Sequence, residues 1–341
     1  MIKKKQQFEN LLEELAEYIT NPDGTLKVIS SGIVSLDIIL GTGGIPLGRF
    51  IELFGPPASG KTTIAMTIVS EFLKADDRFV SYCDAEQGLS ESFISYFITP
   101  ELRERFLLLQ PGTLEDALTV CEKAINSKSC SLVILDSIGS LVPQAVLKNN
   151  LGDSHVAVLS RIFTQFLQRN MSNARINACT FIGINQVRAD FGSYIKSFAT
   201  PGGFAWKHLI TLGIELKFPS MIKQGDDKIG QNTPIVIKKN KLATPLRSFP
   251  VPIIYGKGVD KIRDIIQFGE VAGIINKRGS YYVFDDINLG LGMNNAIKFL
   301  ESSPEVLDKI KERCYNLLEK FDNVSFEVLE KGDDDAEVDF S

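Results

Sequence analysis

Over much of its length the chain alternates between short apolar runs and longer segments in which apolar residues recur every three or four positions. The short runs predict buried β-strands, and the periodic segments predict helices with one buried face. The strand candidates are residues 26–29, 50–54, 79–83, 106–109, 132–135 and 180–184, and the helical patterns lie at 64–69, 114–127 and 156–171. Apolar strands that alternate with helices predict an α/β fold with a mostly parallel sheet covered by helices on both faces.

The two ends of the chain follow other patterns. Residues 6–19 place apolar side chains at helical spacing, and we expect this helix to pack on its own core or on a neighbouring subunit. A small α+β module follows the core, with a helix at 259–274, a strand at 281–284 and helices at 293–302 and 304–321. We therefore divide the chain into an N-terminal helix and linker (1–29), a core (30–258), a small C-terminal α+β domain (259–330) and an acidic tail (331–341).

A glycine-rich turn joins the predicted strand at 50–54 to the helix that follows it. The turn fits the phosphate-binding motif G-x-x-x-x-G-K-[ST] with Gly55, Pro56, Pro57, Ala58, Ser59, Gly60, Lys61, Thr62 and Thr63. Its glycines allow backbone N–H groups to close around a triphosphate, and the helix directs its positive end at the anion. Lys61 would pair with the β/γ-phosphates, and the Thr62 hydroxyl would hold Mg²⁺. The alternative is a turn that matches by chance, and the flanking strand and helix argue against it.

Three other predicted strands end in polar residues, at the edge where parallel sheets bind ligands. Asp136 closes the strand at 132–135, which is typical of a second Mg²⁺-site residue acting directly or through water; the alternative is an Asp that caps the next helix. Glu86 follows the strand at 79–83 and is either the residue that orients or deprotonates the attacking water or an exposed loop residue. Gln186 places an uncharged amide where a γ-phosphate could be sensed.

Composition indicates an ordinary globular protein, because 44% of the 341 residues are hydrophobic and 23% are charged. No apolar run approaches the ~20 residues of a membrane span, and the N-terminus lacks the apolar core of a signal peptide. We therefore expect a cytoplasmic protein with no membrane partner. The cysteines are scattered without metal-ligand spacing, which predicts buried, reduced thiols at Cys83, Cys121, Cys130, Cys179 and Cys314.

The net charge of −5 is concentrated at the C-terminus. Residues 333–341 hold five acidic side chains and no basic one, so the rest of the chain carries equal numbers of acids and bases. On composition alone, an acidic block of this kind is usually a solvated tail that improves solubility.

The motifs occur in the order and approximate spacing of the bacterial RecA recombinases, which the chain resembles over about residues 28–275 and more loosely toward both ends. The resemblance rests on Ser35-Leu36-Asp37, residues 43–49, the P-loop, Asp84-Ala85-Glu86, residues 152–155, Ile184-Asn185-Gln186-Val187-Arg188, Gly202-Gly203 and residues 239–243. It implies a RecA-like P-loop ATPase core and a helical filament in which ATP lies between subunits. The helix at 6–19 would then dock on the neighbouring core.

The resemblance also implies roles for single residues. Glu86 corresponds to the catalytic glutamate, Asp136 to the Mg²⁺-site aspartate, and Gln186 to the residue that couples the γ-phosphate to a DNA-binding loop. Phe93 takes the place of a tyrosine that stacks on adenine, which keeps the ring, and Pro245 joins the ATP site.

Two lysines near the end of the core match a pair that reaches the γ-phosphate bound by the neighbouring subunit. They are Lys239 and Lys241, and by themselves they would suggest a solvated strand end. The resemblance instead adds both to the catalytic set with Glu86, Lys61 and Gln186.

The same resemblance places DNA on two loops near the filament axis. The first covers residues 152–156, and the second runs from Arg188 to Gly203, a long glycine-containing stretch that indicates a functional loop. Arg188 would hold phosphate, while Val156 and Phe191 would wedge between bases. His155 has no expected chemical role. The residues expected to contact DNA are Val156, Arg161, Arg188, Phe191, Gly192, Gly202 and Gly203.

Several positions in this region depart from the family pattern. Asp190 stands where a base is expected, the second loop is one residue shorter, Phe204 replaces Asn, and Gln168 replaces Arg. These changes weaken the cationic surface, so we expect DNA affinity to be lower and more sensitive to salt than in a typical member. His208 replaces an aromatic residue linked to communication between subunits.

These features together predict an ATP-dependent recombinase that uses ATP and Mg²⁺. It would form a homo-oligomeric filament on single-stranded DNA and pair it with homologous duplex DNA. The acidic tail would compete with DNA for basic groups. The C-terminal domain would present a basic face for duplex DNA, or merely a solvated one, with Lys277, Arg278, Lys298, Lys309, Lys311 and Arg313. The alternatives are a ring motor or recombination mediator of the same fold, and a regulatory filament protein that hydrolyses ATP poorly.

Overall fold

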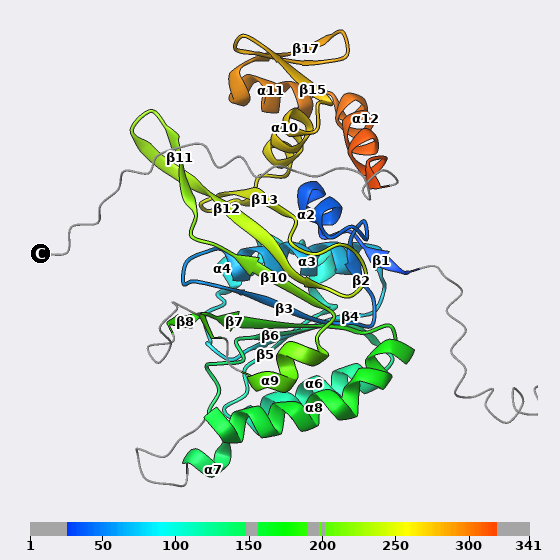
Figure 1. The fold of residues 1–341 in the computed structure, drawn as a ribbon, viewed down its shortest axis with the longest axis vertical. Coiled ribbons are helices and arrows are strands. Elements are labelled where there is room, and N and C mark those ends of the chain that lie inside the picture. The colour runs from blue at the N-terminus through cyan, green and yellow to red at the C-terminus, as the bar shows by residue number, and fades with distance from the viewer. Residues whose placement is uncertain (1–25, 148–155, 190–197, 200–201, 319–341) are drawn as a thin grey trace, which may run out of the picture.

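The computed structural model describes residues 26–147, 156–189, 198–199 and 202–318 (Figure 1). The helix predicted at 6–19, the acidic tail and parts of both predicted DNA loops, including His155, Asp190, Phe191 and Gly192, lie outside these residues. The described part forms a large central sheet with helices on both faces and a small module at one end.

Parallel strands form the centre of the main sheet. In order across the sheet they are β5 (Phe106–Leu109), β4 (Phe79–Asp84), β6 (Cys130–Asp136), β7 (Thr180–Gln186), β3 (Phe50–Gly55) and β10 (Leu212–Leu216). The central strands β6, β7 and β3 are buried along nearly their whole length, which is why the sequence shows them as continuous apolar runs. Their carboxyl ends lie at one edge of the sheet, and the polar residues singled out above lie there.

An antiparallel extension continues the sheet beyond β10. The long strand β12 (Asp227–Asn240) pairs with β10, with β11 (Ser220–Gln224) and with β13 (Ser248–Ile254), which in turn pairs with β14 (Gly258–Val259). Apart from the carboxyl end of β12, expected as the strand end at Lys239, the sequence did not predict β10 or these strands, because polar residues interrupt their apolar positions and Pro250 and Pro252 lie within β13. The predicted α/β fold is confirmed, and the sheet is mixed, with a parallel centre and an antiparallel extension.

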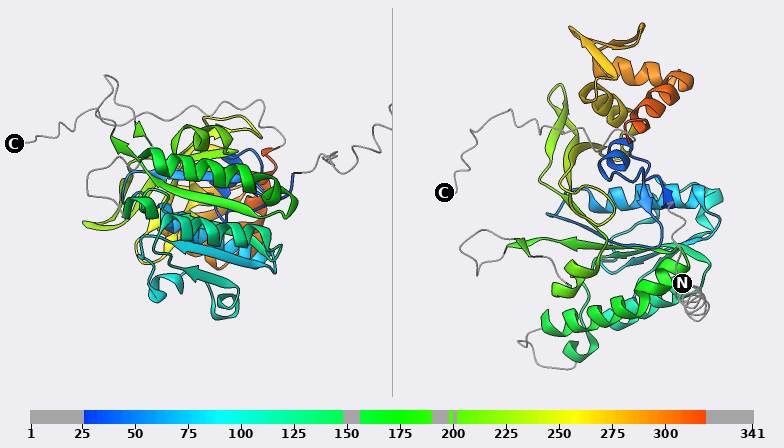
Figure 2. Two further views of the ribbon diagram at one scale, coloured as in Figure 1. Left: turned by 90° about the horizontal axis from the view of Figure 1, so that it is seen from below. Right: turned by 45° about the vertical axis from the view of Figure 1, so that its right-hand side comes forward.

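Helices cover both faces of the sheet (Figures 1 and 2). On one face lies α3 (Lys61–Ala75), and on the other lie α6 (Leu114–Asn126), α8 (Val156–Ile176) and α9 (Gly203–Leu209). Each face has its own apolar core, with Ile64, Ile68 and Phe72 under α3 and with Phe163 and Trp206 on the opposite side. Three short helices complete this part of the chain: α4 (Glu91–Ile94), α5 (Pro100–Arg103) and α7 (Gln144–Leu147).

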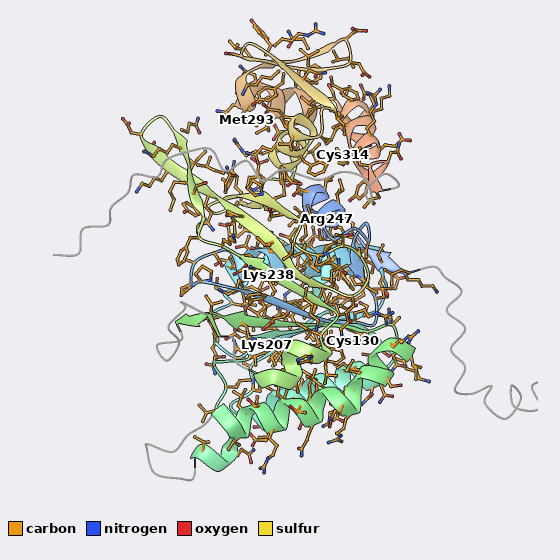
Figure 3. The ribbon with its side chains drawn as sticks, in the orientation of Figure 1. Cys130, Lys207, Lys238, Arg247, Met293 and Cys314 are labelled. Atoms are coloured by element: carbon orange, nitrogen blue, oxygen red, sulfur yellow. The ribbon has the colours of Figure 1, made fainter. Side chains whose placement is uncertain are left out.

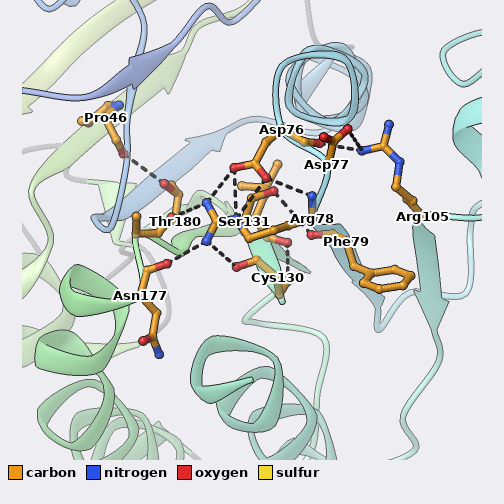
Figure 4. A network of polar contacts seen from close by, with 12 residues as sticks. Pro46, Asp76, Asp77, Arg78, Phe79, Arg105, Cys130, Ser131, Asn177 and Thr180 are labelled. Carbon is orange, nitrogen blue, oxygen red and sulfur yellow. Dashed lines mark hydrogen bonds and ion pairs between the residues drawn. The ribbon is translucent and has the colours of Figure 1, made fainter. Parts of the chain in front are cut away.

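At the amino ends of the parallel strands, opposite the polar edge, Arg78 joins several loops (Figure 4). Its Nη2 lies 2.7 Å from Oδ2 of Asp76, and its Nη1 and Nη2 donate to the carbonyls of Asn177 (2.7 Å) and Ala178 (3.2 Å). Arg105 donates to the carbonyl of Asp76 at 2.5 Å. A guanidinium satisfies several acceptors at once, so this network holds the starts of β4 and β7 together.

The C-terminal module consists of α10 (Lys261–Val271), β15 (Ile275–Arg278), β16 (Tyr281–Phe284), β17 (Ile287–Leu291), α11 (Gly292–Glu301) and α12 (Pro304–Tyr315). Figure 3 labels Met293 and Cys314 within it. The module packs against α2 (Val34–Ile39), where the Tyr315 hydroxyl donates to Oδ2 of Asp37 at 2.7 Å. Two helices are shorter than predicted: Asp260 caps α10 by accepting from the N–H of Arg263 (3.0 Å), and α12 ends at Tyr315.

The remaining expectations concern small features. The strand predicted at 26–29 is β1 (Val28–Ile29), which pairs with β2 (Ile45–Pro46) apart from the main sheet. All five cysteines are free and buried, as predicted. Among the helices of the described ranges, none combines the length and apolar character needed to cross a membrane.

Candidate functional site

The turn between β3 and α3 has a backbone that only glycine allows at two positions. A Cβ on Gly55 would lie 2.4 Å from the carbonyl oxygen of Leu216 on the neighbouring strand. Gly60 has φ +92°, and a Cβ there would lie 2.4 Å from Cδ1 of Ile253. The helix begins directly after it at Lys61, so its first N–H groups face the concave side of the turn.

Side chains of strand β12 donate hydrogen bonds to the backbone of this turn. Gln231 Nε2 donates to the carbonyl of Ala58 (3.2 Å), and Thr233 Oγ1 donates to the carbonyl of Ser59 (3.0 Å). Both donors are buried. The sequence analysis missed these residues, because a single Gln or Thr in a strand far along the chain carries no motif.

A cavity of about 510 Å³ opens between the turn and the carboxyl ends of the strands. It is lined by Pro57, Ala58, Gly60, Lys61, Thr62, Thr63, Glu86, Phe93, Asp136, Gln186, Gln231, Ile253 and Tyr255. The structure thus brings most of the predicted ATP-site residues together, while Gly55, Pro56 and Ser59 belong to the same turn behind the lining. Pro245 is exposed in the loop between β12 and β13 and does not line the cavity.

Asp136 and Thr62 meet at one wall of the cavity. Thr62 Oγ1 donates to Oδ2 of Asp136 at 3.0 Å, and the hydroxyl of Tyr82 donates to the same oxygen at 2.7 Å. Burial raises the pKa of Asp136, whereas these hydrogen bonds act to lower it. The next helix begins only at Gln144, so Asp136 does not act as its cap. A carboxylate beside a hydroxyl at the end of a phosphate-binding turn is a donor set that suits Mg²⁺.

The ammonium group of Lys61 lies over the turn. Its Nζ donates to the carbonyls of Gly55 (3.1 Å) and Pro56 (2.7 Å). Burial lowers the pKa of Lys61, and the nearby charges of Asp136 and Glu86 act in the opposite direction. A partly desolvated cation at this position suits a polyphosphate, whose charge would favour the protonated amine.

Glu86 extends from the loop after β4 into the same cavity. Its Oε1 accepts from Ser137 Oγ at 2.6 Å and from Gln186 Nε2 at 3.0 Å. Glu86 is exposed, which leaves the carboxylate open to water, and its two donors fix its direction. The contact with Ser137 was not foreseen from the sequence.

Two aromatic side chains line the cavity and could contact a base. Phe93, the predicted adenine contact, is half-buried and lies 5.1 Å from Phe97 between ring centres. Tyr255 is 51% exposed, and its hydroxyl donates to Gln231 Oε1 at 3.3 Å. Sequence reasoning missed Tyr255, because the strand before it, β13, was not predicted and no motif marks the residue. The donors and rings together fit a nucleotide with its metal ion.

Lys239 and Lys241 lie outside this cavity. Lys239 Nζ donates to the carbonyls of Lys207 (2.6 Å) and His208 (2.8 Å), and Lys241 Nζ donates to those of His208 (2.9 Å) and Leu209 (3.3 Å). Both lysines therefore hold the carboxyl end of α9, where cations are favoured. Burial and the neighbouring Lys241 lower the pKa of Lys239.

The two predicted DNA loops end side by side. Gly203 begins α9 with φ +76°, and a Cβ there would lie 2.5 Å from Oγ of Ser160 in the second turn of α8. Val156 is the first residue of α8, and Arg161 on that helix is exposed. The second turn of α8, just after the first loop, is thus packed against the start of α9, where the second loop ends.

The base of the second loop is a short ladder. Strand β8 (Arg188–Ala189) pairs with β9 (Phe198–Ala199), so the stretch expected to be open throughout begins and ends as a hairpin. Gly202 caps α9 in the left-handed region, at φ +104°. The hairpin follows directly from β7, whose last residue is Gln186.

The proposed basic face of the C-terminal module is partly neutralised. Ion pairs join Lys277 to Glu270 (3.7 Å), Lys311 to Asp308 (3.1 Å) and Arg313 to Asp285 (2.7 Å). Paired charges of this kind attract a polyanion less strongly, so the module supports a DNA contact less clearly than the two loops do.

Two family models match the chain. The model described as the RecA N-terminal domain matches residues 13–260, and the one described as the RecA C-terminal domain matches residues 263–319.

Curated relatives agree with these matches. The chain is 34% identical to Protein RecA of Clostridium tetani over 92% of its own length and 89% of that protein. It is 33% identical to Protein RecA of Listeria seeligeri over 96% of its length and 92% of that protein. It is 33% identical to Protein RecA of Mannheimia haemolytica over 86% of its own length and 79% of that protein.

Solved structures also share the fold. One of them is the crystal structure of the RadB recombinase, with a TM-score of 0.52 and 24% identity, covering 68% of this chain and 98% of the other. At that identity the likeness concerns the fold alone.

Proposed function

This chain belongs to the RecA family of recombinases, and from that premise we propose that it hydrolyses ATP in a DNA-dependent manner within a filament on single-stranded DNA. Recombination and DNA repair are the processes that this family serves, and ATPase activity is part of it. The finer points, which concern individual residues, DNA dependence and subunit contacts, are our proposal.

In this proposal the phosphates of ATP lie in the turn between β3 and α3. Lys61 pairs with the β/γ-phosphates, and backbone N–H groups from Gly60 onward bind their oxygens. Thr62 and Asp136 hold Mg²⁺, directly or through water, and the ion when bound would neutralise phosphate charge and orient the phosphate chain. Phe93 contacts the adenine.

Hydrolysis in this scheme depends on Glu86. The carboxylate accepts a proton from, or orients, the water that attacks the γ-phosphate. Ser137 and Gln186 hold it in place, and Lys239 and Lys241 reach the γ-phosphate of the neighbouring subunit. To do so, those two lysines would have to break their hydrogen bonds to the carbonyls of α9. Contact between subunits would therefore change the interactions at the end of that helix.

DNA would bind at the two loops. Arg188 and Arg161 would bind phosphate, with Val156 and Phe191 between bases and the loop glycines close to the backbone. The single observation that carries the proposal is the hydrogen bond from Gln186 to Glu86 at 3.0 Å, because Gln186 ends the strand that leads into the second loop. A DNA contact at the loop would then be joined to the hydrolytic carboxylate by a short stretch of backbone and one hydrogen bond.

Steady-state ATP hydrolysis with and without single-stranded DNA, across a salt series, tests the proposal. We expect stimulation by DNA that weakens with salt, no turnover in Lys61→Ala, and weaker stimulation in Arg188→Ala, with a salt slope lower by about one. Lys128→Ala, in the turn before β6 at the opposite edge of the sheet, is the matched control. An ATP hydrolysis rate that does not change with DNA at any salt concentration would contradict DNA dependence. Very weak turnover would favour a regulatory filament protein.

A further inference from the structure

The hydroxyl of Tyr82 reaches the candidate metal site from behind. Tyr82 lies on β4 with 0% of its side chain exposed, and its ring centre is 6.2 Å from that of Phe106. Its hydroxyl donates to Oδ2 of Asp136 at 2.7 Å. Asp136 and Thr62 line the cavity, whereas Tyr82 lies outside the lining. The tyrosine therefore acts on the site only through the carboxylate.

The register of the sheet explains how the hydroxyl arrives there. Tyr82 is paired with Ile134 on β6, and Asp84 is paired with Asp136. Side chains two residues apart on a strand share a face, so the ring of Tyr82 lies on the same face as Asp136 and extends toward it through the core under α3. A phenylalanine would fill the same apolar space. The hydroxyl adds one buried donor, which is tolerated because Asp136 accepts its hydrogen bond.

The carboxylate of Asp136 thus receives two donors from different elements. Thr62 on α3 and Tyr82 on β4 both donate to Oδ2. The terminal torsion of an aspartate is broad when nothing constrains it, and two converging donors restrict it. A Thr62 hydroxyl that donates its hydrogen bond to Asp136 keeps its oxygen lone pairs for a cation. The tyrosine helps to hold the carboxylate in an orientation in which Asp136 accepts from Thr62 while the Thr62 oxygen faces the cavity with free lone pairs.

We propose that Tyr82 is a positioning residue of the metal site formed by Thr62 and Asp136. This inference rests on the nucleotide function proposed above and adds to it a residue that contacts neither nucleotide nor metal. Residues that hydrogen-bond to metal ligands change metal affinity by about 10- to 100-fold when they are mutated in well-studied sites. The effect should therefore appear in the magnesium dependence of nucleotide binding rather than in folding alone.

The test is thermal unfolding of the full chain with saturating ADP across a Mg²⁺ series, with ADP and a chelator as the baseline. In Tyr82→Phe we expect the Mg²⁺ concentration for half of the ADP-induced stabilisation to rise about tenfold. The control is Tyr315→Phe, because the Tyr315 hydroxyl also donates to a buried aspartate, Asp37, at 2.7 Å. That control should lower the unfolding midpoint without changing the Mg²⁺ requirement.

The outcomes separate the proposal from the function on which it rests. A wild-type Mg²⁺ requirement in Tyr82→Phe, or the same increase in Tyr315→Phe, would overturn the role of Tyr82 and leave the nucleotide site standing. A wild-type protein that gains no Mg²⁺-dependent stability from ADP would overturn both. Steady-state hydrolysis gives a second reading, in which added Mg²⁺ should restore the rate of Tyr82→Phe.

Discussion

Gln186 Nε2 donates to Oε1 of Glu86 across 3.0 Å, and this bond joins the last residue of β7 to the loop after β4. The next residue, Val187, donates its N–H to the carbonyl of Gly55 in the proposed phosphate-binding turn (3.3 Å). Arg188 then begins the hairpin at the base of the second predicted DNA loop. Three consecutive residues therefore contact the candidate catalytic carboxylate, the turn and the loop.

Gln186→Ala should uncouple hydrolysis from DNA. The change removes one of the two donors to Glu86 and leaves Ser137, so we expect basal hydrolysis to fall by no more than about tenfold while stimulation by DNA is lost. Steady-state rates with and without single-stranded DNA measure both quantities. Gln224→Ala, on the exposed strand β11, should behave as wild type. Stimulation that survives in Gln186→Ala would remove this residue from the coupling.

The sequence predicted those site residues that belong to a motif or follow the end of an apolar strand. Lys61 and Thr62 follow from a fixed spacing, and Asp136 and Glu86 follow apolar strands, so their meeting at one edge of a parallel sheet was foreseeable. Gln231 and Tyr255 were not, because they lie on and after antiparallel strands whose alternating pattern is weak. The side of the cavity that they form comes from tertiary contacts that no local pattern records.

The fold shows the same division. The strands at 79–84, 106–109 and 130–136 are mainly apolar and lie within a residue or two of their predicted bounds, and 79–84 and 130–136 are buried along most of their length. Strand β12 has polar residues at several positions, and only its carboxyl end was expected, as the strand end at Lys239. The contacts of Lys239 and Lys241 with α9 were also invisible, since a lysine that donates to a helix end has the same local sequence as one in solvent.

Mixing two inactive variants should restore hydrolysis if Lys239 and Lys241 act on the neighbouring subunit. Lys61→Ala lacks the phosphate lysine but keeps the pair, and the double variant Lys239→Ala/Lys241→Ala has the reverse defect. In a head-to-tail filament mixed at equal ratio, about a quarter of the interfaces would combine both intact halves. We therefore expect about a quarter of the wild-type rate from two proteins that are each inactive alone.

The control for this mixture is Lys238→Ala. Lys238 is the neighbour of Lys239 on β12, but it forms an ion pair with Glu215 at 3.2 Å. Figure 3 labels Lys238, together with Lys207 of α9. It should hydrolyse ATP as wild type does. The double variant also loses the donors to the end of α9, which should cost about 1 kcal/mol of stability, so its folding must be checked by circular dichroism. A mixture that stays inactive while both proteins are folded and bind DNA would place the lysines' role within one subunit.

Gly203→Ala should disturb the contact between α8 and α9, next to the two predicted DNA loops. A Cβ at Gly203 would lie 2.5 Å from Ser160 Oγ, in addition to the strain of φ +76°. We expect a loss of about 2–4 kcal/mol in the free energy of unfolding and weaker binding of single-stranded DNA. Gly279→Ala is the matched control, because Gly279 has φ +62° and no atom within 4 Å of the added Cβ. It should lose only about 1 kcal/mol; equal losses in both variants, with DNA binding intact, would show that the α8–α9 contact is unimportant.

Two buried carboxylates at the junction of α2 with the C-terminal module should make stability depend on pH. Burial raises the pKa of Asp264 from 3.8 to about 7 and that of Asp37 to about 6. Asp264 accepts from the N–H of Ser35 (3.1 Å) and from its hydroxyl. The titratable groups facing it from α2 and α12 are Asp37, Cys314 and Tyr315.

The sign follows from proton linkage. Between about pH 4 and pH 7 the folded state keeps protons that the unfolded state releases, so the stability that protonated Asp264 contributes is full below about pH 4 and is lost as the pH rises to about 7. Asp264→Asn removes this titration and keeps both bonds to Ser35, because the amide can accept from the N–H and donate to the hydroxyl. Urea unfolding should therefore show a stability difference, variant minus wild type, that grows with pH by up to about 1.4 kcal/mol per unit. Asp308→Asn, whose side chain is 71% exposed, should show no such trend; a flat difference for Asp264→Asn would mean that this carboxyl is ionised in the folded protein throughout the range.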